Sequence, residues 1–140
     1  MTVATDLAAR IEAAFNDGKP DDFAACFAPE GVQHHPFFPE PNRGRSAIAD
    51  AERGMFQAFD NIHFETIRVV DGGEWASFEF TVSARHCSPL SMPDGSKVPA
   101  TNKTVDLALA SIVRIGADGL IEEEHRYQDN LAFLRQLGLA

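Results

Sequence analysis

Residues 119–139 read GLIEEEHRYQDNLAFLRQLGL and join a strand pattern to a helix pattern. Ionisable residues alternate through the first half, and apolar residues at helical spacing fill the second half up to Gly138. Asp129 directly precedes the apolar run, where an aspartate side chain can accept the free N–H groups of a helix start. The stretch predicts a strand followed by a short C-terminal helix. Asp129 is predicted to be its N-cap, with an acid in a pocket as the alternative.

Three further β-rich runs precede this stretch, at residues 62–70, 74–86 and 103–115. A DGG turn, a long loop over residues 87–102 and a GADG turn separate the runs from one another and from the strand at 120–128. Consecutive strands joined in this way predict an antiparallel meander.

Helical spacing dominates the earlier part of the chain. Helices are predicted over residues 5–18, 21–31 and 47–59, and a proline-rich extended segment at 32–44 is incompatible with a central strand. Helices followed by consecutive strands is the α+β order. The sequence therefore predicts one domain over residues 1–140, with three N-terminal helices packed on a curved antiparallel sheet and a short C-terminal helix.

The composition excludes several classes of partner. The formal net charge is −9, with the acids spread along the chain, whereas nucleic acids and anionic membranes require clustered Lys and Arg. No apolar run approaches the ~18 residues of a membrane span, so we expect a cytoplasmic protein. Cys26 and Cys87 match no metal-binding motif, and we expect both to be free thiols.

Several segments together resemble a known family. They are AFDNIHFETIRVV (58–70), SARHCSPL (83–90), PDGSKV (93–98) and the quoted C-terminal stretch. With the order of elements, they make the chain similar to the SnoaL-like polyketide cyclases and ester cyclases of the NTF2-like superfamily. The resemblance implies a cone-shaped sheet that encloses a deep, mostly apolar pocket, and dimers through the sheet. Members include ketosteroid isomerases, epoxide hydrolases, dehydratases, cyclases and binding proteins.

The pairing of the strands decides which side chains share the pocket, because successive strand residues point to opposite faces. We expect pairing around a turn at Asp94 and Gly95, and Arg114 opposite Ile121. One face then carries Phe78, Phe80, Val82, Ala84, His86, Asp106, Ala108, Ala110, Ile112, Glu123, His125 and Tyr127. A slip of one residue would exchange the two faces.

Asp106 is the first candidate for catalysis, because a carboxyl inside the apolar run TVDLALASIV has a raised pKa and can act as general acid or base. The alternative is a carboxyl near water at the start of the strand. His86 and His125 could orient Asp106 or relay a proton, and Tyr127 could stabilise an oxyanion. Each could instead be a hydrogen-bonded residue of the pocket wall. The candidates for substrate binding are His35, Phe38, Phe59, Phe78, Phe80, Ala108, Ala110 and Glu123.

The C-terminal stretch departs from the family at one position. Aromatic polyketide cyclases of the family often end in E-H-W-D-x-x-D, and Arg126 stands here in place of the first aspartate. If that aspartate is the acid/base group of the family, this chain lacks it at position 126.

Metal and cofactor signals are weak. His34 and His35 are adjacent on an extended segment, where neighbouring side chains diverge, so we expect no metal site. The sequence has neither a nucleotide-binding glycine loop nor a G-x-S-x-G motif, and we expect no cofactor.

These observations favour a cofactor-independent enzyme that acts on a small apolar carbonyl compound by acid/base chemistry, such as isomerisation, aldol cyclisation or dehydration. A non-catalytic protein that binds a small hydrophobic molecule is the alternative. Epoxide hydrolysis ranks last, because Arg85 lies on the face opposite His86. A homodimer is expected, because one apolar set would otherwise be exposed on the outer sheet face: Val105, Leu107, Leu109 and Val113.

Overall fold

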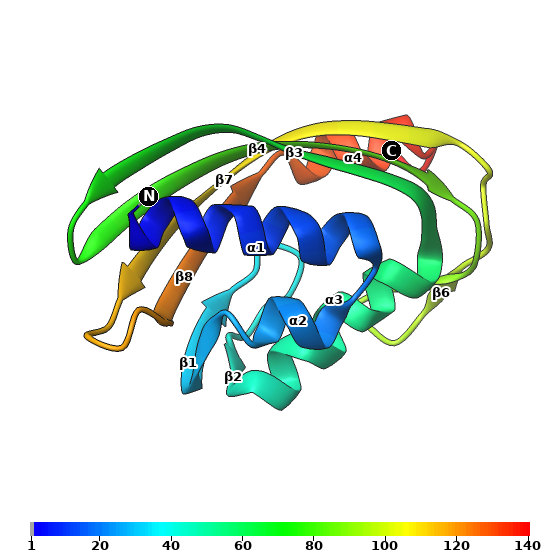
Figure 1. The fold of residues 1–140 in the computed structure, drawn as a ribbon. Coiled ribbons are helices and arrows are strands. Elements are labelled where there is room, and N and C mark those ends of the chain that lie inside the picture. The colour runs from blue at the N-terminus through cyan, green and yellow to red at the C-terminus, as the bar shows by residue number, and fades with distance from the viewer. Residues whose placement is uncertain (1) are drawn as a thin grey trace.

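The computed structural model describes residues 2–140 and has an α+β fold (Figure 1). Its elements follow in the order α1 (Val3–Asp17), α2 (Pro20–Ala24), β1 (Phe27–His34), β2 (Asn42–Arg43), α3 (Arg45–Ala58), β3 (Phe59–Gly72), β4 (Trp75–His86), β5 (Leu90–Ser91), β6 (Lys97–Val98), β7 (Thr104–Ile115), β8 (Ile121–Gln128) and α4 (Asn130–Gln136). None of the helices within the described residues is long and apolar enough to cross a membrane.

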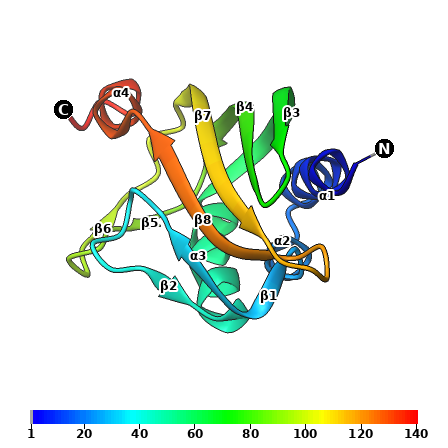
Figure 2. The same ribbon diagram turned by 90° about the vertical axis from the view of Figure 1, so that its left-hand side faces the viewer.

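Six strands form one curved sheet in the order β2-β1-β8-β7-β4-β3, which Figure 2 shows from the side of β1 and β8. The meander β3-β4-β7-β8 is antiparallel as predicted. The expectation of a wholly antiparallel sheet was wrong, because β1 pairs with β8 in parallel. The sequence predicted a helix and a loop over residues 21–44, and β1 was therefore missed. Pro29 lies where the β1–β8 register shifts, a place where a missing N–H is tolerated.

The helices lie against the concave side of the sheet, with α1 closest to β3 (Figure 1). Phenylalanines fill the space between the two layers. Phe15 of α1 stacks on Phe64 of β3 with ring centroids 4.3 Å apart, and Phe23 and Phe56 pack edge-on against Phe15 at 5.3 and 5.1 Å. Burial of these large apolar side chains holds α1, α2 and α3 to one face of the sheet.

Side chains cap the starts of α1 and α4 but not the start of α3. The cap of α1 is Thr2, in a reciprocal capping box with Thr5. Helix α3 begins at Arg45 without a side-chain cap. The Asp129 cap is confirmed, because its side chain accepts the Ala132 N–H at 2.9 Å.

The register of β7 differs from the predicted register by one residue. Phe80 lies opposite Leu109, not Ala110. The long loop is not one symmetric hairpin about Asp94, because β5 and β6 pair separately and Asn102 adopts a positive φ of 57° before β7 begins. The residues at alternate positions of β7 are therefore exchanged between the two faces of the sheet.

This slip overturns the argument for a dimer. Val105, Leu109 and Val113 are buried under the helices, and Leu107 lines a pocket there. They do not form an exposed patch, so the homodimer stays a prediction without its original reason.

Replacing Asp129 with Ala should lower the free energy of unfolding by about 1 kcal/mol, because the first turn of α4 loses its side-chain acceptor. Denaturant unfolding followed by circular dichroism measures the change. Asp129→Asn keeps an acceptor and should stay close to wild type. Equal losses in both variants would contradict the capping role.

Candidate functional site

A pocket lies between the helices and the concave face of the sheet. Its empty volume is about 630 Å³, part of it open to solvent. Four polar residues line it, from α3, from β8 and from the position directly after β1: His35, Glu52, Arg126 and Gln128. The remaining lining is apolar and consists of Phe15, Met55, Phe56, Phe59, Ile62, Phe64, Val82, Ala84, Val105, Leu107, Leu109 and Phe133. An apolar cavity with a few convergent polar groups is typical of a small-molecule site.

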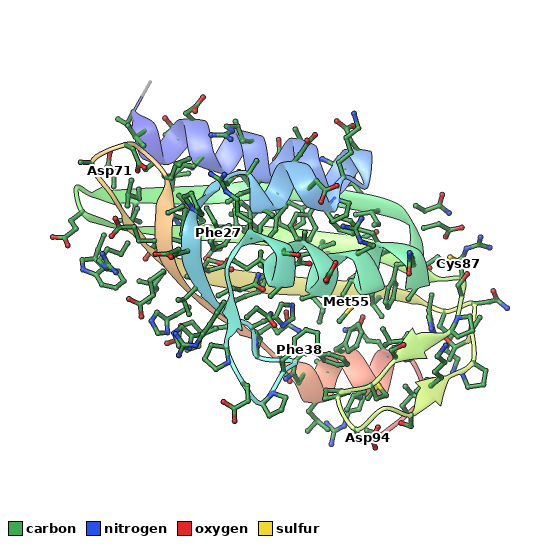
Figure 3. The ribbon with its side chains drawn as sticks, turned by 90° about the horizontal axis from the view of Figure 1, so that it is seen from below. Phe27, Phe38, Met55, Asp71, Cys87 and Asp94 are labelled. Atoms are coloured by element: carbon green, nitrogen blue, oxygen red, sulfur yellow. The ribbon has the colours of Figure 1, made fainter. Side chains whose placement is uncertain are left out.

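One side of this pocket is closed by the loop after β1 and by α4. In Figure 3, Phe38 lies between α3, which carries Met55, and α4. The side chains of Phe38 and Met55 pack against a buried apolar cluster that contains Phe59 and Phe133. The segment after His34 therefore covers this part of the pocket before the chain returns to the sheet as β2, which pairs with β1.

A buried ion pair forms the polar end of the pocket. Arg126 Nη2 lies 2.9 Å from Glu52 Oε1, and Arg126 Nε lies 3.6 Å from Glu124 Oε2. Glu52 is only 1% exposed. The Arg126 guanidinium also lies over the rings of Phe15 and Phe23, at 5.8 and 5.6 Å from their centroids, which adds cation–π attraction.

Neutral donors complete the network around these charges. Gln33 Nε2 donates to Glu52 Oε1 at 3.2 Å and to Glu124 Oε1 at 3.1 Å. Ser111 Oγ donates to Glu124 Oε2 at 2.7 Å, and Asn42 Nδ2 donates to Gln33 Oε1 at 2.9 Å. The network therefore links five elements, β1, β2, α3, β7 and β8, through polar side chains.

The charge balance of the network favours a protonatable Glu52. Two carboxyl groups share one buried cation, so ionisation of both would leave an excess negative charge out of water. Burial raises the pKa of Glu52, and the Arg126 charge opposes this rise. Burial alone would lower the pKa of Arg126, but Glu52 and Glu124 outweigh that effect and raise it. Arg126 therefore stays charged.

His35 is a neutral donor beside Glu52. The Phe37 N–H donates to His35 Nδ1 at 3.1 Å, so Nε2 carries the ring proton. Nε2 lies 3.9 Å from Glu52 Oε1. Burial, reinforced by the Arg126 charge, lowers the pKa of His35 well below its usual range. The imidazole can donate a hydrogen bond at neutral pH without carrying a charge.

The structure separates the predicted catalytic residues from the pocket. Asp106 is exposed on the outer face of β7, and the Tyr127 side chain is exposed on β8. His125 lies on the same outer face, beside Glu123. The expectation that these residues face the pocket was wrong because of the register slip. Their catalytic roles stay predictions without that geometric basis.

His86 faces inward as expected, but it does not line the pocket. Its ring stacks on Phe59, and Nδ1 accepts the Thr101 N–H at 3.2 Å. Nε2 is buried and has no hydrogen-bond partner among residues 2–140. Burial lowers the pKa of His86, so the ring is neutral.

The predicted substrate-binding residues divide into four groups. His35 and Phe59 line the pocket, whereas Phe38 lines neighbouring grooves at the surface. Phe78 and Phe80 belong to the buried core. The last group lies on the outer face, contrary to expectation: Ala108, Ala110 and Glu123.

Sequence reasoning missed Glu52 and placed Arg126 on the wrong face. Glu52 stands in the polar run DAERG, where it reads as part of a solvated helix surface. The sequence did mark position 126 as unusual, because Arg126 stands where the C-terminal stretch of the aromatic polyketide cyclases often has an aspartate. That position points into the pocket.

A family model described as a SnoaL-like domain matches residues 8–124. The chain belongs to the SnoaL-like family. The resemblance seen in the sequence is thereby confirmed.

Individual relatives of this SnoaL-like chain span nearly its whole length. The aklanonic acid methyl ester cyclase DnrD of Streptomyces peucetius is 30% identical over an alignment of 144 positions. The alignment covers 99% of this chain and 92% of DnrD. The structure of TsrD from Streptomyces laurentii superposes with a TM-score of 0.84 at 25% identity, over 99% of this chain and 96% of TsrD.

A Catenulispora acidiphila protein with a ketosteroid isomerase-like fold superposes with a TM-score of 0.76 over 96% of this chain and 94% of its own. At 15% identity it supports the fold alone. The predicted NTF2-like architecture, helices on a curved sheet with a short C-terminal helix, is confirmed.

Replacing Arg126 with Met should lower the free energy of unfolding by about 3–5 kcal/mol at pH 7, because Glu52 and Glu124 lose their buried counter-ion. The loss should shrink as pH falls. The folded variant binds protons on buried carboxyls more tightly than the unfolded chain does, so its stability decreases as pH rises above the usual glutamate pKa.

Denaturant unfolding at pH 5 and pH 7 measures both effects. The double variant Arg126→Met with Glu52→Gln should recover part of the loss, since one buried acid is removed. A loss that is small and equal at both pH values would contradict a role for Arg126 as the counter-ion.

Proposed function

We propose that the protein is a cofactor-independent enzyme that binds a small, largely apolar carbonyl compound in this pocket and moves a proton on it with Glu52. The observation that carries the proposal is the placement of Glu52. It is the one carboxyl among the described residues that line a mostly apolar pocket, and it is held 2.9 Å from a buried cation. Membership of the SnoaL-like family supports a small-molecule substrate.

Glu52 has an oxygen free for this task. Gln33, Arg126 and His35 all approach Oε1, which leaves Oε2 for a ligand in the pocket. The raised pKa of Glu52 brings the carboxyl closer to neutrality, where a general base or acid is most efficient.

The chemistry needs no co-reactant. Ionised Glu52 takes a proton from the carbon beside a carbonyl, and the electron pair of the broken C–H bond moves onto the carbonyl oxygen as an enolate. In an aldol cyclisation, the enolate carbon forms a bond to a second carbonyl carbon of the same molecule. The new alkoxide then takes the proton back from Glu52.

Arg126 and His35 stabilise the oxyanion in this scheme. A guanidinium has five N–H donors, and Arg126 uses Nη2 on Glu52. The neutral His35 ring offers Nε2–H on the same side of the pocket. Preorganised donors in an apolar site stabilise developing negative charge without reorganisation. The name of the relative DnrD favours ring closure over isomerisation or dehydration.

Replacing Glu52 with Gln should lower kcat/KM by about 10²–10⁴-fold, because the shape is kept and the proton acceptor is lost. Aklanonic acid methyl ester is the first substrate to test, followed by other polyketide-like ketones. Glu65→Gln changes an exposed glutamate on β3 and serves as the matched control.

Wild-type rates in Glu52→Gln would contradict the proposal. Asp106→Asn separates the proposal from the sequence-based assignment, since a large loss there would restore Asp106 as the acid/base group. Binding of these ketones without turnover would support the non-catalytic alternative.

The rate should rise with pH along a limb whose midpoint lies above the usual glutamate pKa. Glu52 acts as a base only when ionised, and burial raises its pKa. Arg126 and Glu124 from β8 and His35 directly after β1 surround it, and Arg126 limits the rise. A pH profile of kcat/KM measures the limb. A midpoint at or below the usual glutamate value would contradict the role of Glu52 as the base.

A further inference from the structure

A second cluster of polar side chains lies on the outer face of the sheet, away from the pocket. His125 Nε2 lies 2.7 Å from Glu123 Oε1, and His34 Nε2 lies 3.6 Å from the same oxygen. One ligand atom from each of the three residues lies within 4.8 Å of the other two. Two imidazoles and a carboxylate thus converge on one small volume.

The parallel pairing of β1 and β8 creates this cluster. His34 and His125 are direct partners across the two strands, and Glu123 precedes His125 by two residues, so all three project from one face. The two rings stack with centroids 4.2 Å apart and planes only 4° from parallel. All three side chains are half-buried, so ions from solution can reach them.

We propose that His34, Glu123 and His125 bind a divalent transition metal ion of the zinc class. Zinc binds imidazole nitrogen and carboxylate oxygen at about 2.0–2.2 Å, which places the ligand atoms of a tetrahedral site about 3.3 Å apart. The separations of 2.7 and 3.6 Å bracket that value. Small side-chain rotations would therefore close the site.

The donor set selects the kind of ion. Imidazole nitrogens favour zinc, nickel and copper over magnesium and calcium, which prefer oxygen ligands. Three protein ligands leave a fourth position for water or for a group on another molecule. His34 and His125 also line a surface groove, together with residues that include Pro36, Phe38, Glu40 and Tyr127.

One competing charge accompanies the site. Arg114 Nε lies 3.7 Å from Glu123 Oε2, whereas both imidazoles approach Oε1. A metal on Oε1 can therefore bind while Arg114 stays on the other oxygen. The ion takes the place of the hydrogen bond between His125 Nε2 and Glu123, and the ring proton then sits on Nδ1. Protons compete with the ion for these ligands, so binding weakens as pH falls.

The proposal does not rest on the proposed function. His34 and His35 diverge, as expected of adjacent residues on an extended segment, and only His35 faces the pocket ion pair. We expected no metal site because the two histidines diverge and because no His/carboxylate motif at ligand spacing was recognised in the sequence. The additional ligands come from β8, which is distant in sequence.

Isothermal titration calorimetry of the chelator-treated full chain with zinc chloride tests the site. Wild type should bind one ion per chain. His125→Ala and Glu123→Gln should each raise the Kd at least tenfold, because each removes a ligand. His63→Ala is the matched control, since His63 is an exposed histidine on β3 outside the cluster, and its Kd should equal that of wild type.

Absence of zinc binding by wild type would overturn the proposal, as would an unchanged Kd in both ligand variants. Circular dichroism checks that each variant is folded, and His34→Gln replaces any variant that is not. As a second measurement, zinc should shift the ring resonances of His34 and His125 in NMR spectra of the wild-type protein, but not those of His63. A shift confined to His63 would also overturn the proposal.

Discussion

The buried charge cluster of Glu52, Arg126 and Glu124 is the constraint on which the rest of the structure depends. Charges out of water are tolerated only when they are paired and hydrogen-bonded, so α3, β1 and β8 must meet at one place. The Gln33 side chain donates hydrogen bonds to both carboxyl groups, and this fixes the position of β1 relative to α3 and β8. The apolar pocket then has a polar end whose position is set by packing on three elements.

The sequence predicted most elements of the fold because their signals are local. Alternation over residues 62–70, 74–86, 103–115 and 120–128 corresponds closely to β3, β4, β7 and β8. The C-terminal helix was identified by its cap for the same reason. Strand β1 escaped prediction because Pro29 and Gly31 interrupt its pattern, and a parallel partner lies far along the chain.

The candidate site could not be predicted from local patterns. It depends on whether each connecting loop has an odd or an even number of residues, because one residue more or less exchanges the two faces of the next strand. One residue of positive φ at Asn102 and a register shift after Arg114 decide which set of alternate residues faces inward. Alternation identifies two faces of a strand but does not distinguish between them when both carry ionisable groups, as Glu123 and Glu124 do. Glu52 was missed for a different reason, since an acid in a polar stretch of helix resembles a solvated one.

The parallel contact between β1 and β8 also orders events during synthesis. Gln33 and Glu124 are 91 residues apart, so β1 gains its main partner only after almost the entire chain has been made. Until β8 leaves the ribosome, α3 presents Glu52 without its cation, and the first half of the chain has no complete core. The two halves of the protein therefore cannot fold one after the other during synthesis. A truncated chain that lacks β8 would expose the phenylalanines that pack between the helices and the sheet, and chaperones and proteases would act on it.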